Sequence, residues 1–218
     1  MMTWDVCVAD MLYLESVFSI FALLWVCVLR LDEASEWSFS LFGPLASAYS
    51  VRRYWGVYWH DYIKESFSAY AKIVTRQWLK WHRPSAARRV VENSLVFVVS
   101  GLMHSLVRYV QTDGEGEVWT VALWYSAQMA PIVIEGVVQH LWRKSSLEAE
   151  LHQWLGERAV WRLERTVGYV WVFGWMFWSV PKYLLTRHAW ETANLRRKYP
   201  ELFGRGVKDV KVAVGGDS

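Results

Sequence analysis

Long apolar runs alternate with charged stretches along this chain, and four of the runs are long enough to cross a membrane. The predicted spanning helices are residues 11–29, 91–111, 118–142 and 166–186. Each holds about 20 residues or slightly more, which is what an α-helix needs to cross a hydrocarbon core of about 30 Å. The pattern therefore predicts an all-α membrane protein with about four transmembrane helices.

Three further segments are predicted to lie in the membrane interface. Across residues 59–81 apolar side chains recur at every third or fourth position, with basic and acidic side chains largely on the opposite face. Residues 145–165 are likewise amphipathic and mixed in charge. Residues 37–49 are rich in aromatic and small side chains but contain Gly43-Pro44, which favours a short re-entrant or interfacial element over a span.

The distribution of basic residues predicts which side of the membrane each loop faces. Ten Lys or Arg residues lie between Arg30 and Arg89, whereas residues 112–117 contain three acidic residues and no basic one. Because basic loops stay on the cytosolic side, the first segment is predicted to be cytosolic and the second lumenal or external. Alternation then places residues 187–218 on the far side, although this polar tail carries seven Lys or Arg residues.

Composition supports a membrane protein and excludes several other classes. The 218 residues include 16 Trp, and 54% are hydrophobic; Trp and Tyr collect at membrane interfaces. A net charge of +3 is too small to indicate nucleic-acid binding, so the basic residues are expected to face lipid headgroups. Cys7 and Cys27 show no metal-ligand spacing. The start lacks the features of a cleavable signal peptide, so residues 1–36 are predicted to form a retained anchor.

His104 lies inside the second predicted span, where an ionisable side chain is costly and is therefore a functional candidate. Polar or small side chains recur every three or four residues on both sides of His104, and together with Phe97 they form one stripe along the helix. These side chains are Asn93, Ser100, Gly101, Arg108 and Gln111. Such a stripe faces the bundle interior or a wet cavity. Ser100 and Gly101 leave space in the turn toward which the imidazole leans. Alternatively, they only let a neighbouring helix approach closely.

The third predicted span carries two unusual residues. Pro131 is expected to kink the helix, because proline cannot donate the hydrogen bond that continues it. Glu135 is a second charge in an apolar segment. We expect Glu135 to accept hydrogen bonds within the bundle, either as a structural cap or as the partner of a basic loop residue.

Three motifs resemble the wax-synthase-like branch of the membrane-bound O-acyltransferases. They are WSFSLFGPL at residues 37–45, SVRRYWGVYWH at 50–60 and FVVSGLMH at 97–104. Their combination is specific, since fixed order, matching small residues and an intramembrane histidine coincide. The resemblance covers about residues 37–186, the predicted acyltransferase domain, and only the C-terminal half of the family fold. Within that branch the chain is most similar to fungal enzymes that acetylate secondary metabolites.

The resemblance implies transfer of an acyl group from acyl-coenzyme A to a hydroxyl in the endoplasmic reticulum membrane. His104 matches the family's catalytic histidine, expected to act as general base, and His60 matches a second polar position that aligns substrate or stabilises developing charge. The predicted substrate-binding residues are Arg52, Arg53, Trp59, Ser100 and Gly101. The two arginines are expected to hold the phosphates of coenzyme A; an equally strong alternative is contact with lipid headgroups.

The implied partners are acyl-coenzyme A, with acetyl-coenzyme A favoured, a hydrophobic alcohol and membrane lipids. The alcohol would be terpenoid, polyketide-derived or fatty. No bound cofactor or metal is implied. Apolar surroundings favour a neutral imidazole, which can accept a proton. No serine or cysteine nucleophile motif indicates a covalent enzyme intermediate.

Two alternatives to an active acyltransferase remain open at this stage. In the first, the chain is a truncated, non-catalytic membrane remnant or scaffold of the same family. A half-length chain would be inactive alone or complete only with another copy or chain. A haem or quinone redox protein would use His104 as an axial ligand, but it also needs a second deep histidine facing the first.

Overall fold

The computed structural model describes residues 8–59 and 64–203, and the regular elements in these ranges are all helical. The longer helices are α2 (Asp10–Ala22), α4 (Lys64–Ile73), α5 (Ala86–Gln111), α6 (Trp119–Ala127), α7 (Met129–Lys144), α8 (Ser146–Leu155) and α9 (Glu157–Lys198). The shorter helical segments are η2 (Leu23–Val28), η3 (Ala34–Trp37), η4 (Leu45–Ser47), α3 (Val51–Arg53), η5 (Tyr54–Tyr58), η6 (Val74–Trp78) and η7 (Pro200–Phe203). The predicted all-α class is confirmed.

Three helical stretches in the described part of the chain are long and apolar enough to cross a membrane. They are Asp10–Val28, Ala86–Gln111 and Trp119–Lys144, and they correspond to the first three predicted spans. The predicted fourth span, 166–186, is helical within α9 but is not among them. Its tryptophan and tyrosine side chains lower the mean hydropathy of a segment that lies mostly beside other helices.

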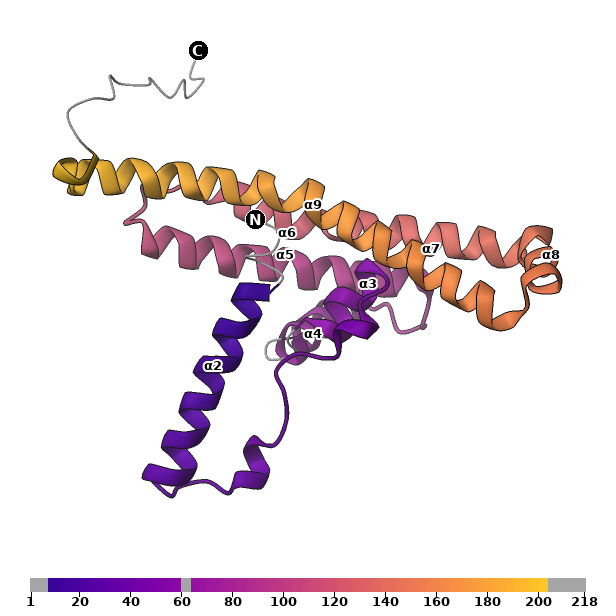
Figure 1. Cartoon of the computed structure of the whole chain (residues 1–218), viewed down its shortest axis with the longest axis horizontal. Helices are drawn as coiled ribbons and strands as arrows, with labels where there is room; N and C mark the ends of the chain where they lie inside the picture. The colour runs from indigo at the N-terminus through magenta and orange to yellow at the C-terminus, as the bar shows by residue number, and fades with distance from the viewer. Residues whose placement is uncertain (1–7, 60–63, 204–218) are drawn as a thin grey trace, which may run out of the picture.

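Figure 1 shows α5, the pair α6 and α7, and α9 lying alongside one another along the longest axis of the molecule. Helix α8 joins α7 to α9 at one end, while α2 points away from the bundle and has no buried residue. Helix α4 packs against α5, and Thr75 of η6, which continues α4, donates from its hydroxyl to Glu92 Oε1 of α5 at 2.8 Å. Within the predicted interfacial segment 59–81, residues 64–78 are helical as α4 and η6, and residues 60–63 lie outside the described ranges.

The third predicted span is divided, as its proline suggested. Helix α6 ends at Ala127 and α7 begins at Met129, so the break falls at Gln128. Pro131 explains the position, because its missing N–H and its ring remove the bond to the carbonyl of Ala127, four residues earlier. The helix is therefore interrupted close to Pro131; the size of any bend stays a prediction.

The boundary between the last two predicted helices lies at an earlier residue than the sequence pattern predicted. Residues 145–165 do not form one surface helix: α8 stops at Gly156, whose φ of 75° is in the left-handed region, and α9 then runs for 42 residues. A glycine there ends the helix without steric cost, whereas no breaker follows before Pro181. Helix α9 also continues through the predicted boundary at 186, so residues 187–198 are helical.

The two ends of the bundle are tied by different contacts. At one end, Arg197 Nη2 lies 2.9 Å from Glu115 Oε2, which places the end of α9 beside the acidic loop 112–117. At the other end, the guanidinium of Arg165 lies over the ring of Tyr49, 4.4 Å from its centroid. The last helix therefore runs from the segment that contains Tyr49 to the acidic loop 112–117.

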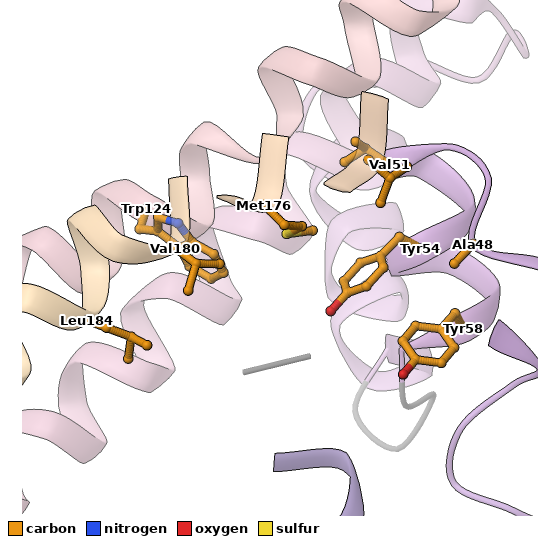
Figure 2. Close-up of a cluster of buried hydrophobic side chains, with 9 residues drawn as sticks. Ala48, Val51, Tyr54, Tyr58, Trp124, Met176, Val180 and Leu184 are labelled. Carbon is orange, nitrogen blue, oxygen red and sulfur yellow. The ribbon is translucent and has the colours of Figure 1, made fainter. Parts of the chain in front are cut away.

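A small apolar core joins the aromatic turn before residue 60 to α6 and α9. Figure 2 shows Ala48, Val51, Tyr54 and Tyr58 facing Trp124 of α6 and three residues of α9. The α9 members of this core are Val172, Met176, Val180 and Leu184, spaced four residues apart. Such spacing puts them on one helical face, so α9 fixes the position of the turn that carries the predicted motif.

Candidate functional site

The stripe of α5 predicted around His104 lines two pockets. Asn93, Phe97 and Ser100 border a main pocket of about 680 Å³. Arg108 and Gln111, further along the same face, border a second pocket of about 270 Å³. His104 borders both. Gly101, the remaining member, is buried against Ala122 of α6, so the stripe faces the bundle interior or a cavity as predicted.

The imidazole of His104 stacks on the phenol ring of Tyr125 from α6. The ring centroids are 4.3 Å apart and the planes differ by 5°. Tyr125 and Trp59 also border both pockets. Three side chains from three separate segments therefore form the partition between the two cavities, and a ring face holds the orientation of the imidazole.

The opposite wall of the main pocket is the turn from Tyr49 to Trp59. Ser50 is the N-cap of α3 and accepts a hydrogen bond from the backbone N–H of Arg53 at 3.1 Å. The carboxylate of Glu135 accepts from the backbone N–H groups of Val51 and Arg52. Glu135 is therefore a structural cap that anchors this turn to α7, one of the two roles expected for it.

The rim of the main pocket is basic. Arg52, Arg53, Lys64 and Arg143 line it, and no acidic side chain is among its lining residues in the described part of the chain. Arg53 donates from Nε to the carbonyl of Ser47 at 2.9 Å and lies over the ring of Tyr49. A cluster of this kind attracts phosphate groups of a soluble ligand or of lipids.

Five of the seven predicted site residues line the main pocket: Arg52, Arg53, Trp59, Ser100 and His104. The predicted second histidine, His60, lies outside the described residues. Gly101 is not in the lining; a Cβ there would lie 2.8 Å from the backbone oxygen of Ala122. Its position agrees with the alternative reading, in which the glycine lets α6 approach α5. The chemical roles of these residues stay predictions.

Two residues of the site did not stand out in the sequence. Tyr125 sits in a run rich in aromatics, where nothing distinguishes it from its neighbours. Gln128 is fully buried and accepts hydrogen bonds from Trp175 Nε1 at 2.8 Å and Trp55 Nε1 at 3.4 Å. Trp55 forms part of the main pocket wall, so this amide positions a pocket residue; an isolated polar residue in an apolar segment was the available signal.

The second pocket is lined by two arginines, Arg108 and Arg187. Arg187 of α9 borders it and donates from Nε to Glu191 Oε1 at 2.8 Å. That hydrogen bond raises the pKa of Arg187 above its ordinary value, so the guanidinium stays charged. Arg108 lies 3.7 Å from the same carboxylate oxygen and is almost completely buried. One acidic residue therefore holds two arginines at this end of the bundle.

Comparison with known proteins agrees with the family that the motifs resemble. The profile of the membrane bound O-acyl transferase family matches residues 37–126. This part of the chain belongs to that family. The match contains the turn from Tyr49 to Trp59, the whole of α5 and Tyr125, and so includes His104 and both walls of the main pocket.

The relatives that the chain matches are fungal acetyltransferases. Acetyltransferase nanB of Aspergillus nanangensis is 35% identical over 60% of the chain and 30% of its own length. Acetyltransferase spyB of Aspergillus fumigatus is 28% identical over 85% of the chain and 32% of its own length. Acetyltransferase aurG of Calcarisporium arbuscula is 29% identical over 88% of the chain and 43% of its own length. The chain thus spans about a third of the length of the curated relatives it matches. No solved structure gives a significant match.

Proposed function

We propose that this chain transfers an acyl group, with acetyl favoured, from acyl-coenzyme A to the hydroxyl of a hydrophobic alcohol, with His104 as general base. The observation that carries the proposal is the position of His104 on the wall of a pocket with a basic rim. The family match and the acetyltransferase relatives support the reaction class and the acetyl donor. The proposed location is the endoplasmic reticulum membrane, with residues 37–186 as the acyltransferase domain.

The donor would enter the main pocket from its basic rim. Arg52 and Arg53, with Lys64 and Arg143 nearby, would hold the phosphates of coenzyme A, since guanidinium groups bind phosphate through two parallel hydrogen bonds. The pantetheine arm would then extend toward His104 along the wall formed by Trp55 and Phe97, whose rings contact each other edge to face with centroids 5.9 Å apart. This aromatic wall would keep water from the thioester. His60 is proposed to position substrate beside the same carbonyl.

The reaction would proceed by direct transfer. The neutral imidazole of His104 takes the proton of the acceptor hydroxyl, and the oxygen attacks the thioester carbonyl carbon. The carbon–sulfur bond breaks, and the leaving thiolate takes the proton back from the imidazolium, which yields the ester and free coenzyme A. The stack on Tyr125 supports this role because it holds the imidazole between the two cavities.

Replacing His104 tests the proposal directly. Membranes that contain the chain would be supplied with labelled acetyl-coenzyme A and a panel of hydrophobic alcohols, and labelled ester would be measured. We expect His104→Ala to lower the rate by about 10² or more, which is the usual contribution of a general base. His140→Ala is the matched control, because His140 is exposed on α7 and borders neither pocket.

Two results would contradict the proposal. Equal ester formation by wild type and His104→Ala would exclude a general-base role for this imidazole. No ester from a well-expressed wild-type chain with any alcohol would favour the non-catalytic alternative, in which the chain is a remnant or scaffold of the family.

A further inference from the structure

The second pocket offers hydrogen-bonding groups on the side of His104 that faces away from the basic rim. Its lining includes the side chains of Arg108, Gln111, Tyr183, Thr186 and Arg187. Only a few aliphatic side chains, Leu14, Val107 and Val121, accompany them. Some of these groups already have partners within the protein, since Thr186 donates to the carbonyl of Tyr183 at 2.9 Å and Arg187 to Glu191 at 2.8 Å. A purely hydrocarbon ligand would still remove water from Gln111 and from the remaining hydrogen-bonding positions without replacing it, which costs free energy.

The spacing along α5 gives this pocket a length scale. Arg108 follows His104 by four residues and Gln111 by seven, and all three border the pocket. At 1.5 Å of rise per residue, these positions lie about 6 Å and about 10 Å along the helix axis from the imidazole. A ligand whose hydroxyl meets His104 would place any group about 6 to 10 Å further along beside these two side chains.

The charges around the pocket favour a neutral polar group over an anion. Two arginines in the lining, Arg108 and Arg187, are both within 4 Å of Glu191, at 3.7 and 2.8 Å. The lining also contains the carboxylates of Asp10 and Glu117. Since acidic groups balance the two guanidinium groups, the pocket provides donors and acceptors without a net positive field.

We propose that the second pocket holds the acceptor, and that this alcohol carries a second neutral oxygen group about 6 to 10 Å from the hydroxyl that is acylated. The second group is a hydroxyl, carbonyl or ether oxygen held by Arg108 and Gln111. The inference rests on the proposed function and narrows its acceptor: an oxygen-bearing hydrophobic alcohol is preferred to a plain fatty alcohol of the same length.

Three probes of equal carbon number test this preference. Membranes containing the chain and labelled acetyl-coenzyme A would receive 1-decanol, 1,2-decanediol or 1,6-decanediol. In extended 1,6-decanediol the second oxygen lies within the proposed distance of about 6 to 10 Å from the acylated hydroxyl. In 1,2-decanediol the two oxygens are closer together than this. We expect kcat/KM for 1,6-decanediol to exceed that for the other two by about two- to tenfold, the net contribution of one hydrogen bond.

Two variants assign the preference to the pocket. Gln111→Leu is expected to bring the ratio between 1,6-decanediol and 1-decanol close to one. Arg108→Gln is expected to lower the same ratio through a different side chain. Gln77→Leu, the same change at an exposed glutamine outside both pockets, is expected to leave the ratio as in wild type.

A binding measurement separates this inference from the proposed function. The thermal midpoint of the purified chain in detergent would be compared with each probe, for wild type and Gln111→Leu. Transfer at equal kcat/KM to all three probes would overturn the inference and leave the acyltransferase function standing. Absent transfer with stabilisation specific to 1,6-decanediol would overturn the function but support the pocket. Absent transfer with equal stabilisation by all probes would overturn both.

Discussion

His104 borders two cavities, and its ring is held by a second ring. Tyr125 contributes a face that is nearly parallel to the imidazole, 4.3 Å away between centroids. The ring of Trp124 is nearly perpendicular to that of Tyr125, with centroids 4.9 Å apart, and the ring of Trp55 is tilted against it with centroids 6.3 Å apart. Because the phenol ring is itself packed by tryptophans, it orients the imidazole without competing for the proton that a general base must accept.

Replacing Tyr125 tests this positioning role. Tyr125→Phe keeps the stacked face, so we expect kcat to stay within about twofold of wild type. Tyr125→Leu removes it, and loss of an aromatic pair worth about 0.5–1.5 kcal/mol would lower kcat by roughly 2- to 12-fold while KM for acetyl-coenzyme A stays unchanged. The measurement is steady-state transfer from acetyl-coenzyme A. Equal kcat in the phenylalanine and leucine variants would argue that the ring does not position His104.

At the scale of elements, the site depends on how closely α6 approaches α5. Gly101 of α5 faces the backbone of Ala122, and a Cβ would lie 2.8 Å from that carbonyl oxygen and 3.1 Å from the Cβ of Tyr125. Ser105 adds a hydrogen bond to the carbonyl of Val118 at 2.8 Å. The contact that brings Tyr125 onto His104 is therefore a backbone-to-backbone approach permitted by one glycine.

A single added methyl group tests that approach. Gly101→Ala is expected to push α6 away and to lower the free energy of unfolding by about 1–3 kcal/mol, as overpacking does. Gly136→Ala is the control, because a Cβ at Gly136 of α7 meets nothing within 4 Å. The midpoint of thermal unfolding in detergent would be compared for the two variants. A stable Gly101→Ala chain with altered acceptor preference would instead support the substrate-contact role expected for this glycine.

At the scale of the whole molecule, the two pockets differ in the charged side chains that line them. The main pocket is lined by four basic side chains and by no acidic one among the described residues, whereas the second pocket is lined by both arginines and carboxylates, among them Glu117 of the acidic loop 112–117. The ion pair between Arg197 and Glu115 brings the end of α9 to the same region. Residues 187–198, the start of the predicted tail, therefore end beside the acidic loop, and which side of the membrane this end faces stays a prediction.

Cysteine labelling tests the orientation. In a chain with Cys7 and Cys27 replaced by serine, Gln77→Cys and Glu115→Cys would be exposed to a membrane-impermeant maleimide in sealed vesicles with the cytosolic face outward. Because basic loops stay cytosolic, we expect Gln77→Cys to react at once and Glu115→Cys only after detergent is added. Immediate reaction at both positions would contradict the predicted topology.

Several features could be predicted from the sequence because they depend on local pattern. Helical class, the first three spans and the interruption near Pro131 follow from hydrophobic length and proline chemistry, which do not depend on distant residues. The stripe from Asn93 to Gln111 follows from helical periodicity, and His104 stood out because a titratable group in an apolar run is costly. Motif order then indicated the family, which the comparison with known proteins confirmed for residues 37–126.

Other features were decided by the tertiary structure. Gly101 packs against Ala122, Glu135 caps α3, and Tyr125 and Gln128 reach the site only because α6 lies against α5 and α9. The division of the stripe into two pockets at His104 depends on Trp59 and Tyr125 meeting there from separate segments. Local pattern states which face of a helix is polar, but which neighbours cover that face is set by packing between segments far apart in the chain.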